Sequence, residues 1–140
     1  MTDLLLNSSA ELTFAEDYDL VLVSRKGIKI KDFLGIVQSS GFPIGDWGKW
    51  LRMDLSELIP SDIHEKEDYL NPYQSERVLD INRLLVHSQE VFGNADSVIE
   101  WFNHQSVPLG GVTPKSLLDT TFGINMVRAE IGRIEHGVLA

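Results

Sequence analysis

The chain has 140 residues, 43% of them hydrophobic, no cysteine and a formal net charge of −9. This length fits one domain or two very small ones that share a core, and the apolar fraction suffices for a packed interior. The lack of cysteine excludes disulfides, thiolate metal sites and a cysteine nucleophile. The negative charge opposes nucleic-acid binding except through a local basic patch.

The sequence predicts a soluble, cytoplasmic protein without membrane contact. No apolar run approaches the about 18 residues that a membrane-spanning helix needs. The start, MTDLLLNSS, lacks the basic region and the long apolar stretch of a signal peptide.

The charge is unevenly distributed along the chain. Residues 24–52 hold six basic and two acidic residues, whereas residues 1–23 hold five acidic and no basic ones. An acidic chain suits a basic protein partner, and the same acids also serve as an ordinary solubilising surface. Composition alone leaves both interpretations open.

The N-terminal half predicts short helices separated by tight turns. The apolar run at residues 20–23 ends at Gly27 and does not distinguish helix from strand, so the fold of residues 1–23 stays open. In residues 28–41, apolar side chains recur at helical spacing and Gly41 ends the pattern. The apolar positions are Ile30, Phe33, Leu34 and Val37.

Two further helices follow in the same half. Pro43 stands near the start of the first, and Asp54 and Glu57 have the spacing of a capping box for the second. Helix, turn, helix, turn and short helix within about 30 residues is the rhythm of a helix-turn-helix.

The C-terminal half also predicts helices, and strand signals are few, so we expect an all-α protein. An apolar stripe after Pro72 ends at Gly93, and a third apolar cluster lies in residues 95–105. The last segment has an apolar seam that includes Ile131 and Ile134 as expected core residues. Gly137 is the expected end of this last helix.

Residues 108–123, PLGGVTPKSLLDTTFG, join these helices. Thr113 is expected to cap a short helix that begins at Pro114, and Thr120 to cap the final helix. The pair Gly110–Gly111 permits a backbone path barred to other residues and leaves amide groups uncovered by side chains. Helix caps alone explain this stretch.

No motif for catalysis, a metal or a cofactor is present. The sequence has no phosphate loop, paired His–Glu metal motif or nucleophile elbow. Glu135 and His136 are adjacent, and adjacent helical residues point about 100° apart, which is poor geometry for an acid–base pair. We therefore expect no enzyme, no metal and no cofactor. The four histidines are scattered and lack the spacing of metal ligands: His64, His87, His104 and His136. The three tryptophans are expected in the core: Trp47, Trp50 and Trp101.

An ordered set of motifs in the C-terminal half is more specific than any of its members. The motifs are EVFG, the Trp of EWF, LGG-TP--LLDT--G and the closing RIEHG. In this order and spacing they resemble the toxin-binding domain of Xre/MbcA/ParS-type antitoxins over roughly residues 75–140. The helices predicted in residues 28–60 are similar in layout to the Xre-like helix-turn-helix that precedes this domain in the family.

The resemblance implies an antitoxin of a type II toxin–antitoxin pair. It implies a segment and helix-turn-helix domain in residues 1–70, packed with a toxin-binding domain in residues 71–140. Such an antitoxin binds a RES-domain toxin, an enzyme that consumes NAD⁺, and covers the entrance of its active site. A homodimer, operator DNA and autorepression are further expectations. The implied toxin-binding positions are Gly110, Gly111, Pro114, Leu118, Arg133, Glu135, His136, Gly137 and Ala140.

A physical rationale supports contacts at the chain's end. A pocket for an anionic dinucleotide should be lined with cationic and hydrogen-bond donor groups. Glu135 or the terminal carboxylate of Ala140 could compete for them, and the acidic surface would speed the encounter. Gly111, Pro114 and Leu118 are equally consistent with turn and core residues that only shape the surface.

DNA binding remains open beside a role of the helix-turn-helix in dimerisation or scaffolding. The predicted reading helix offers Ser56 but also Glu57, and acidic residues follow it, although base readout favours Arg, Lys, Asn and Gln. The basic candidates for phosphate contact precede this helix: Lys29, Lys31, Lys49 and Arg52. The alternative function is a stand-alone helix-turn-helix transcriptional regulator whose C-terminal domain mediates dimerisation.

Overall fold

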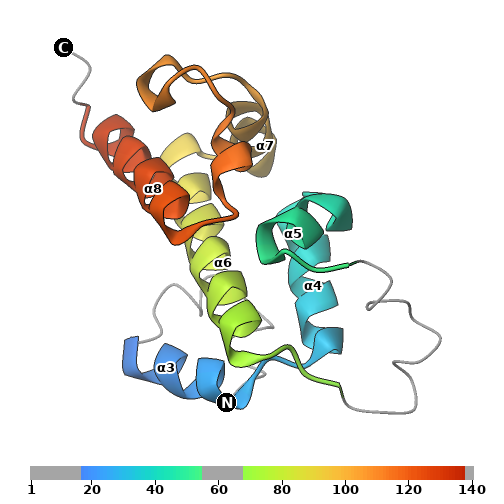
Figure 1. The fold of residues 1–140 in the computed structure, drawn as a ribbon. Coiled ribbons are helices and arrows are strands. Elements are labelled where there is room, and N and C mark those ends of the chain that lie inside the picture. Colours follow the sequence, from blue (N-terminus) through green and yellow to red (C-terminus); the bar gives the residue numbers. More distant parts are fainter. Residues whose placement is uncertain (1–16, 55–67, 138–140) are drawn as a thin grey trace. The chain divides into compact units, whose positions relative to one another are not determined.

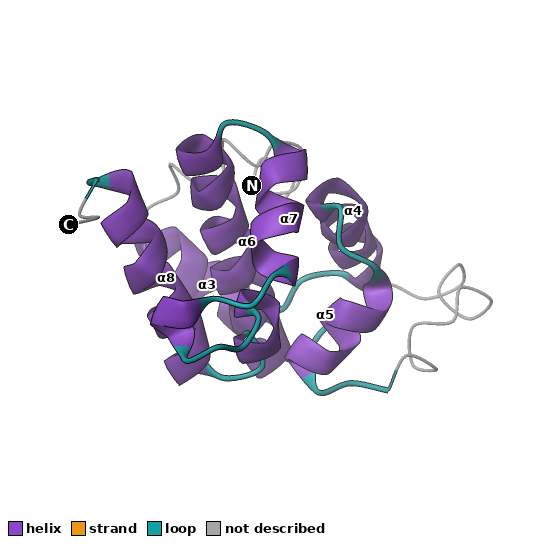
Figure 2. Ribbon diagram, turned by 90° about the horizontal axis from the view of Figure 1, so that it is seen from above, coloured by secondary structure: helices purple, strands orange, loops and turns teal. Residues whose placement is uncertain are grey.

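A computed structural model of the chain describes residues 17–54 and 68–137. All regular elements in these two ranges are helices, which confirms the all-α prediction (Figures 1 and 2). Six of them are α-helices and two are short 3₁₀-helices. They are α3 (Asp17–Lys26), α4 (Ile30–Ser40), α5 (Ile44–Leu51), α6 (Pro72–Phe92), α7 (Ala95–Asn103), η3 (Val107–Leu109), η4 (Pro114–Leu117) and α8 (Thr121–Glu135).

The chain divides into two compact units, and the division falls inside α6. Unit 1 covers Met1–Arg83 and unit 2 covers Leu84–Ala140. The sequence predicts a domain boundary after residue 70, just before α6 begins, whereas the division between the two units falls after Arg83 within this helix.

The α4–turn–α5 pair of unit 1 is built around aromatic side chains. Phe33 and Trp47 are fully buried, and their ring centroids lie 5.9 Å apart at an interplanar angle of 81°. Trp47 also meets Trp50 edge to face at 5.0 Å. Edge-to-face pairs are a favourable arrangement of aromatic quadrupoles, so this cluster fixes the two helices against each other.

Ser40 joins the end of α4 to the start of α5. Its hydroxyl donates to the Val37 carbonyl at 2.7 Å and accepts from the Trp47 indole N–H at 3.0 Å and the Phe42 amide at 3.1 Å. Gly41 then turns the chain with a φ of +80°, which confirms the predicted end of α4. The hydroxyl therefore supplies the partner that the buried indole requires.

In unit 1, backbone hydrogen bonds join the segment at the start of α4 to the segment that precedes α6. The Ile30 amide donates to the Asp68 carbonyl at 2.9 Å, and the Leu70 amide donates to the Ile28 carbonyl at 2.8 Å. Gly27 has a φ of +95°, and a Cβ there would meet the Leu70 carbonyl oxygen at 2.5 Å. Glycine is therefore required at this position by both conformation and space.

The N-terminal end of α6 carries a reciprocal cap. The Gln74 amide donates to the Asn71 side chain at 2.8 Å, and the Asn71 amide donates to the Gln74 side chain at 2.9 Å. Pro72 occupies the first helical position, where no amide is needed.

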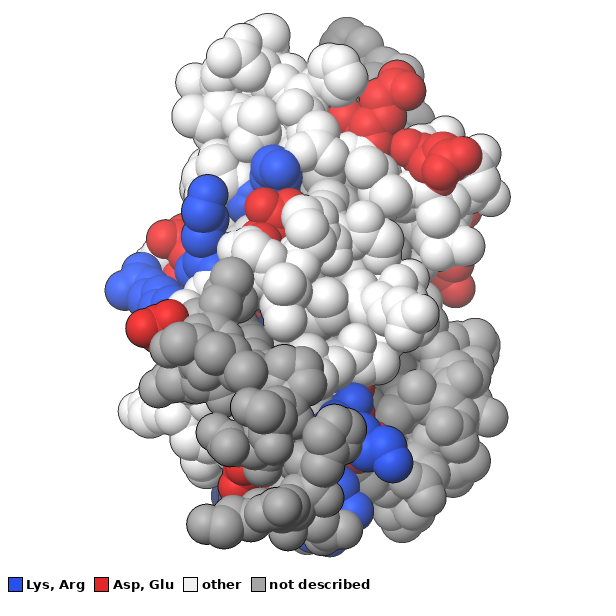
Figure 3. Space-filling model, turned by 90° about the vertical axis from the view of Figure 1, so that its right-hand side faces the viewer, with Lys and Arg blue, Asp and Glu red and all other residues white. Residues whose placement is uncertain are grey.

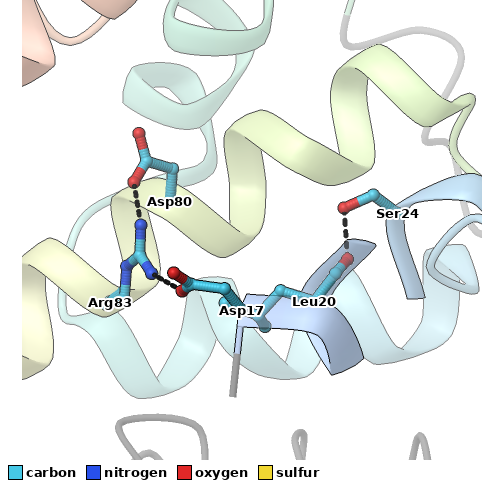
Figure 4. A network of polar contacts seen from close by, with 5 residues as sticks. All are labelled: Asp17, Leu20, Ser24, Asp80 and Arg83. Carbon is cyan, nitrogen blue, oxygen red and sulfur yellow. Dashed lines mark hydrogen bonds and ion pairs between the residues drawn. The ribbon is translucent and has the colours of Figure 1, made fainter. Parts of the chain in front are cut away.

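Residues 17–26, which the sequence left undecided, form the helix α3. None of its residues is buried, and its most exposed apolar residues are Tyr18, Val21 and Leu22. Arg83 on α6 reaches Asp17 at 3.1 Å while also contacting Asp80 at 3.1 Å (Figure 4). An exposed ion pair of this kind stabilises a fold by at most about 1 kcal/mol, so the contact between Arg83 and Asp17 holds α3 only weakly.

Unit 2 packs α7, η3, η4 and α8 around a small apolar core. Contacts join α8 to η3 and η4, and α7 to η4. Thr120 accepts the Gly123 amide at 2.9 Å, which confirms the predicted cap of the last helix. The fully buried or nearly buried apolar residues of this unit are Leu84, Leu85, Val98, Phe102, Leu109, Leu118, Ile124, Val127 and Ile131.

Replacing Gly123 by alanine should destabilise unit 2. A Cβ at Gly123 would overlap the Leu117 carbonyl, because the first turn of α8 lies directly against η4. We expect a loss of about 1–3 kcal/mol in the free energy of unfolding, measured by chemical denaturation followed by circular dichroism.

Gly132→Ala is the matched control in the same helix. A Cβ at Gly132 would have no neighbour within 4 Å. This substitution should stabilise the chain by about 0.5–1 kcal/mol through helix propensity. Equal effects of both substitutions would contradict the close approach at Gly123.

Candidate functional site

The outer side of α8 presents a continuous exposed stripe. Successive residues of a helix are turned by about 100°, so positions 122, 126, 129, 133 and 136 fall within a narrow sector. All five are exposed, whereas the opposite side is buried. The buried residues of α8 are Gly123, Ile124, Val127, Glu130 and Ile131. Ile134, expected in the core with Ile131, is only half-buried.

The double glycine forms the tip of a closed corner. Gly110 and Gly111 have φ values of +93° and +83°, which only glycine adopts readily, and both are exposed. The Gly111 amide donates to the Ser106 carbonyl at 2.8 Å, and the Gly110 amide donates to the Val107 carbonyl at 3.0 Å. Because both amides are used inside the corner, the corner offers bare backbone surface rather than free donors.

Burial of Leu109 anchors this corner to unit 2. The Ser106 amide donates to the Val112 carbonyl at 2.9 Å and closes the loop. The 3₁₀-helix η3 within it packs against α8, and Figure 1 shows the corner toward the same end of the unit as the last turn of α8.

Arg133 is held in place at the end of α8 by Glu130. Its Nε donates to Glu130 Oε1 at 2.8 Å and its Nη2 lies 2.7 Å from the same oxygen. Glu130 is buried, while half of the Arg133 side chain remains exposed. The guanidinium is thus a preorganised cation on the surface.

The last turn of α8 ends as the sequence predicted. The His136 amide donates to the Gly132 carbonyl at 3.1 Å, and Gly137 follows with a φ of +68°. His136 and Gly137 are exposed.

The predicted toxin-binding residues divide into exposed and buried groups. Pro114 and Leu118 are buried, so they support the surface and present no side chain to a partner. Ala140 lies outside the described residues. The exposed members are Gly110, Gly111, Arg133, Glu135, His136 and Gly137.

The expected cap by Thr113 is wrong. Thr113 occupies the position before η4, but its side chain accepts no hydrogen bond from the helix. The Ser116 hydroxyl donates instead to the Thr113 carbonyl at 2.6 Å. Pro114 does stand at the start of η4 as predicted.

Sequence reasoning missed four large apolar side chains of unit 2 that are exposed: Val107, Val112, Phe122 and Met126. Phe122 is 85% exposed and Val107 is 88% exposed, and Met126 is 46% exposed. Phe122 and Met126 stand one turn apart on the outer stripe of α8. The sequence feature that could have indicated their exposure is that neither residue belongs to the apolar seam of the last helix.

Four of the predicted DNA-binding residues lie among the described residues of unit 1. Lys31, Lys49 and Arg52 are exposed, and Lys29 is half-exposed. Ser56 and the third predicted helix lie outside the described residues. On the face drawn in Figure 3, basic side chains stand beside acidic ones among the residues that the structure describes.

The described residues show neither a cluster of metal-ligating side chains nor a helix able to span a membrane. Within residues 17–54 and 68–137, no group of three or more histidine or carboxylate side chains is placed to hold a metal ion. None of the helices described is both long and apolar enough to cross a membrane.

The C-terminal part of the chain is similar to a known class of domain. Residues 87–137 match the family described as antitoxin Xre/MbcA/ParS C-terminal toxin-binding domain. The match begins in α6 and runs through the corner to the end of α8. The resemblance inferred from the motifs is thereby confirmed for this segment.

The chain is also similar to a curated relative. This relative is an antitoxin Xre of Photorhabdus laumondii subsp. laumondii, 38% identical over 68 residues. The alignment covers 48% of this chain and 46% of that relative, so the likeness concerns about half of each.

Proposed function

We propose that the chain is a cytoplasmic antitoxin that neutralises a RES-domain, NAD⁺-consuming toxin by covering its active site. The family match over residues 87–137 carries this proposal, because it coincides with the exposed corner and helix end of unit 2. The chain would act through binding and without catalysis, metal or cofactor.

The outer stripe of α8 is the proposed core of the contact. Along the helix axis Phe122 and Arg133 are separated by about 16 Å, which fits within a standard interface of about 800 Å² per partner. Exposed Phe122 and Met126 supply apolar anchors at one end. The preorganised Arg133 supplies directed polar contacts at the other.

Co-expression with the product of the neighbouring gene tests the proposal. We expect that product to be a RES-domain protein that co-purifies with this chain and consumes NAD⁺ only when the chain is removed. Recovery of the two proteins as separate species, with full NAD⁺ consumption in the mixture, would refute neutralisation.

Repression of its own operon, as a homodimer, is the second proposed function. Two helices of unit 1, α4 and α5, are joined by a three-residue turn, as in a helix-turn-helix. Exposed Lys49 and Arg52 lie at the end of α5 and offer phosphate contacts. A homodimer would match a palindromic operator.

Lys49→Ala should weaken binding to the DNA upstream of the operon. Loss of one phosphate contact lowers the slope of log affinity against log salt by about 1. Fluorescence anisotropy between 50 and 200 mM salt, concentrations over which phosphate contacts change affinity markedly, measures this slope. Lys115→Ala in unit 2 serves as the control with the same charge change, and an equal effect of both would contradict a DNA contact at Lys49.

A further inference from the structure

His87 on α6 stands between two carboxylates of unit 2. Its Nε2 lies 3.1 Å from Glu135 Oε1, and its Nδ1 lies 3.5 Å from Glu90 Oε1. The first contact joins α6 to the last residue of α8, although 48 positions separate the two residues in the sequence. About a third of the His87 side chain is exposed.

Glu135 occupies a position that helix electrostatics disfavours. Carbonyl groups at a helix C-terminus give it a partial negative charge, so a carboxylate there is destabilising unless a donor compensates it. Arg133, the nearby cation, is already bound to Glu130. The Nε2 of His87 can donate an N–H to this carboxylate, which supplies the compensation and ties the helix end to α6.

The direction of Glu135 separates it from the outer stripe. By helical rotation it lies about 100° from His136 and about 140–160° from Phe122 and Arg133. Its contact with α6 agrees with this placement. A side chain in this position can affect the exposed residues of the stripe by fixing the orientation of the last turn of α8.

We infer that His87 and Glu135 form a clamp that fixes the last turn of α8 for toxin binding. Both are positioning residues: they orient Arg133 and His136 and do not themselves contact the toxin. The inference rests on the proposed antitoxin function. An unclamped helix end must be ordered on binding, and that ordering reduces affinity.

A double-mutant cycle tests the clamp. Its readout is the affinity for the co-purified RES-domain product of the neighbouring gene. His87→Ala and Glu135→Ala should each weaken binding about tenfold, and the double variant no more than either alone. His87→Gln, whose amide can donate like Nε2, should restore affinity to within about threefold of the original chain. Competition titration measures the affinities of the original chain and of all four variants.

His104→Ala is the matched control. Nδ1 of His104 lies 2.7 Å from the Glu100 carbonyl oxygen of its own helix, so the substitution leaves the clamp intact. It should not change the affinity. Additive losses in the cycle would show Glu135 contacting the toxin directly and would overturn the clamp, as would wild-type affinity in His87→Ala.

Amide hydrogen exchange of the free chain gives a readout that does not need the toxin. His87→Ala and Glu135→Ala should accelerate exchange at the amides of His136 and Gly137, and His104→Ala should not. Unchanged exchange in both variants would overturn the clamp even if the chain neutralises the toxin. Faster exchange without any toxin binding by the original chain would refute only the proposed function.

Discussion

Deleting residues 136–140 is expected to abolish toxin neutralisation while the fold of unit 2 persists. The deletion removes exposed His136 and Gly137 but leaves the core residues Ile124, Val127 and Ile131. The affinity should fall at least about a hundredfold, or about 2.7 kcal/mol, if these residues close the entrance of the toxin. NAD⁺ consumption by the toxin, titrated with the shortened chain, measures the loss.

Thermal unfolding provides the control for the deletion. The melting temperature should change by only a few degrees, because the removed residues add nothing to the described core. Complete inhibition by the shortened chain at a one-to-one ratio would show that the end of the chain is dispensable.

Phe122→Ala should weaken toxin binding by about 2–4 kcal/mol, the range of an interface hot spot. The side chain is 85% exposed in the free chain, so burial against a partner would remove a large apolar area from water. Isothermal titration calorimetry of the variant against the toxin gives the affinity. Unfolding should be nearly unaffected, because the substitution creates no cavity.

Tyr73→Ala is the matched control for Phe122. Tyr73 is an equally exposed aromatic side chain, at 87%, and lies in unit 1. Its replacement should leave the affinity for the toxin unchanged. Comparable losses in the two variants, or none in Phe122→Ala, would remove Phe122 from the contact surface.

Local signals in the sequence predicted most of the described helices and several of their ends, but left α3 undecided and missed η3. Gly41, Gly93 and Gly137 all end helices and all have positive φ, since the left-handed conformation favours glycine. Thr120 was identified as a cap because a hydroxyl before an apolar helical pattern is a local signal. Thr113 has the same signal, yet its side chain makes no cap. At the short 3₁₀-helix η4, the side-chain hydrogen bond comes instead from the Ser116 hydroxyl, which donates to the Thr113 carbonyl.

The candidate site was harder to predict because its properties depend on tertiary packing. Periodicity placed Ile134 in the core seam, but no neighbour covers it fully. Phe122 lies outside that seam, and the sequence alone does not reveal whether another element buries it. The His87–Glu135 contact joins distant segments, so no spacing rule reveals it. The resemblance located the region, and the fold separated Pro114 and Leu118, which are buried, from the exposed residues.

Hydrogen–deuterium exchange of the chain with and without its toxin tests most directly whether the exposed end of unit 2 is the neutralising surface. Binding should slow exchange in residues 107–112 and 132–137, where the corner and the last turn of α8 lie. Protection confined to α4 and α5, with both of these segments unchanged in the inhibited complex, would contradict the account.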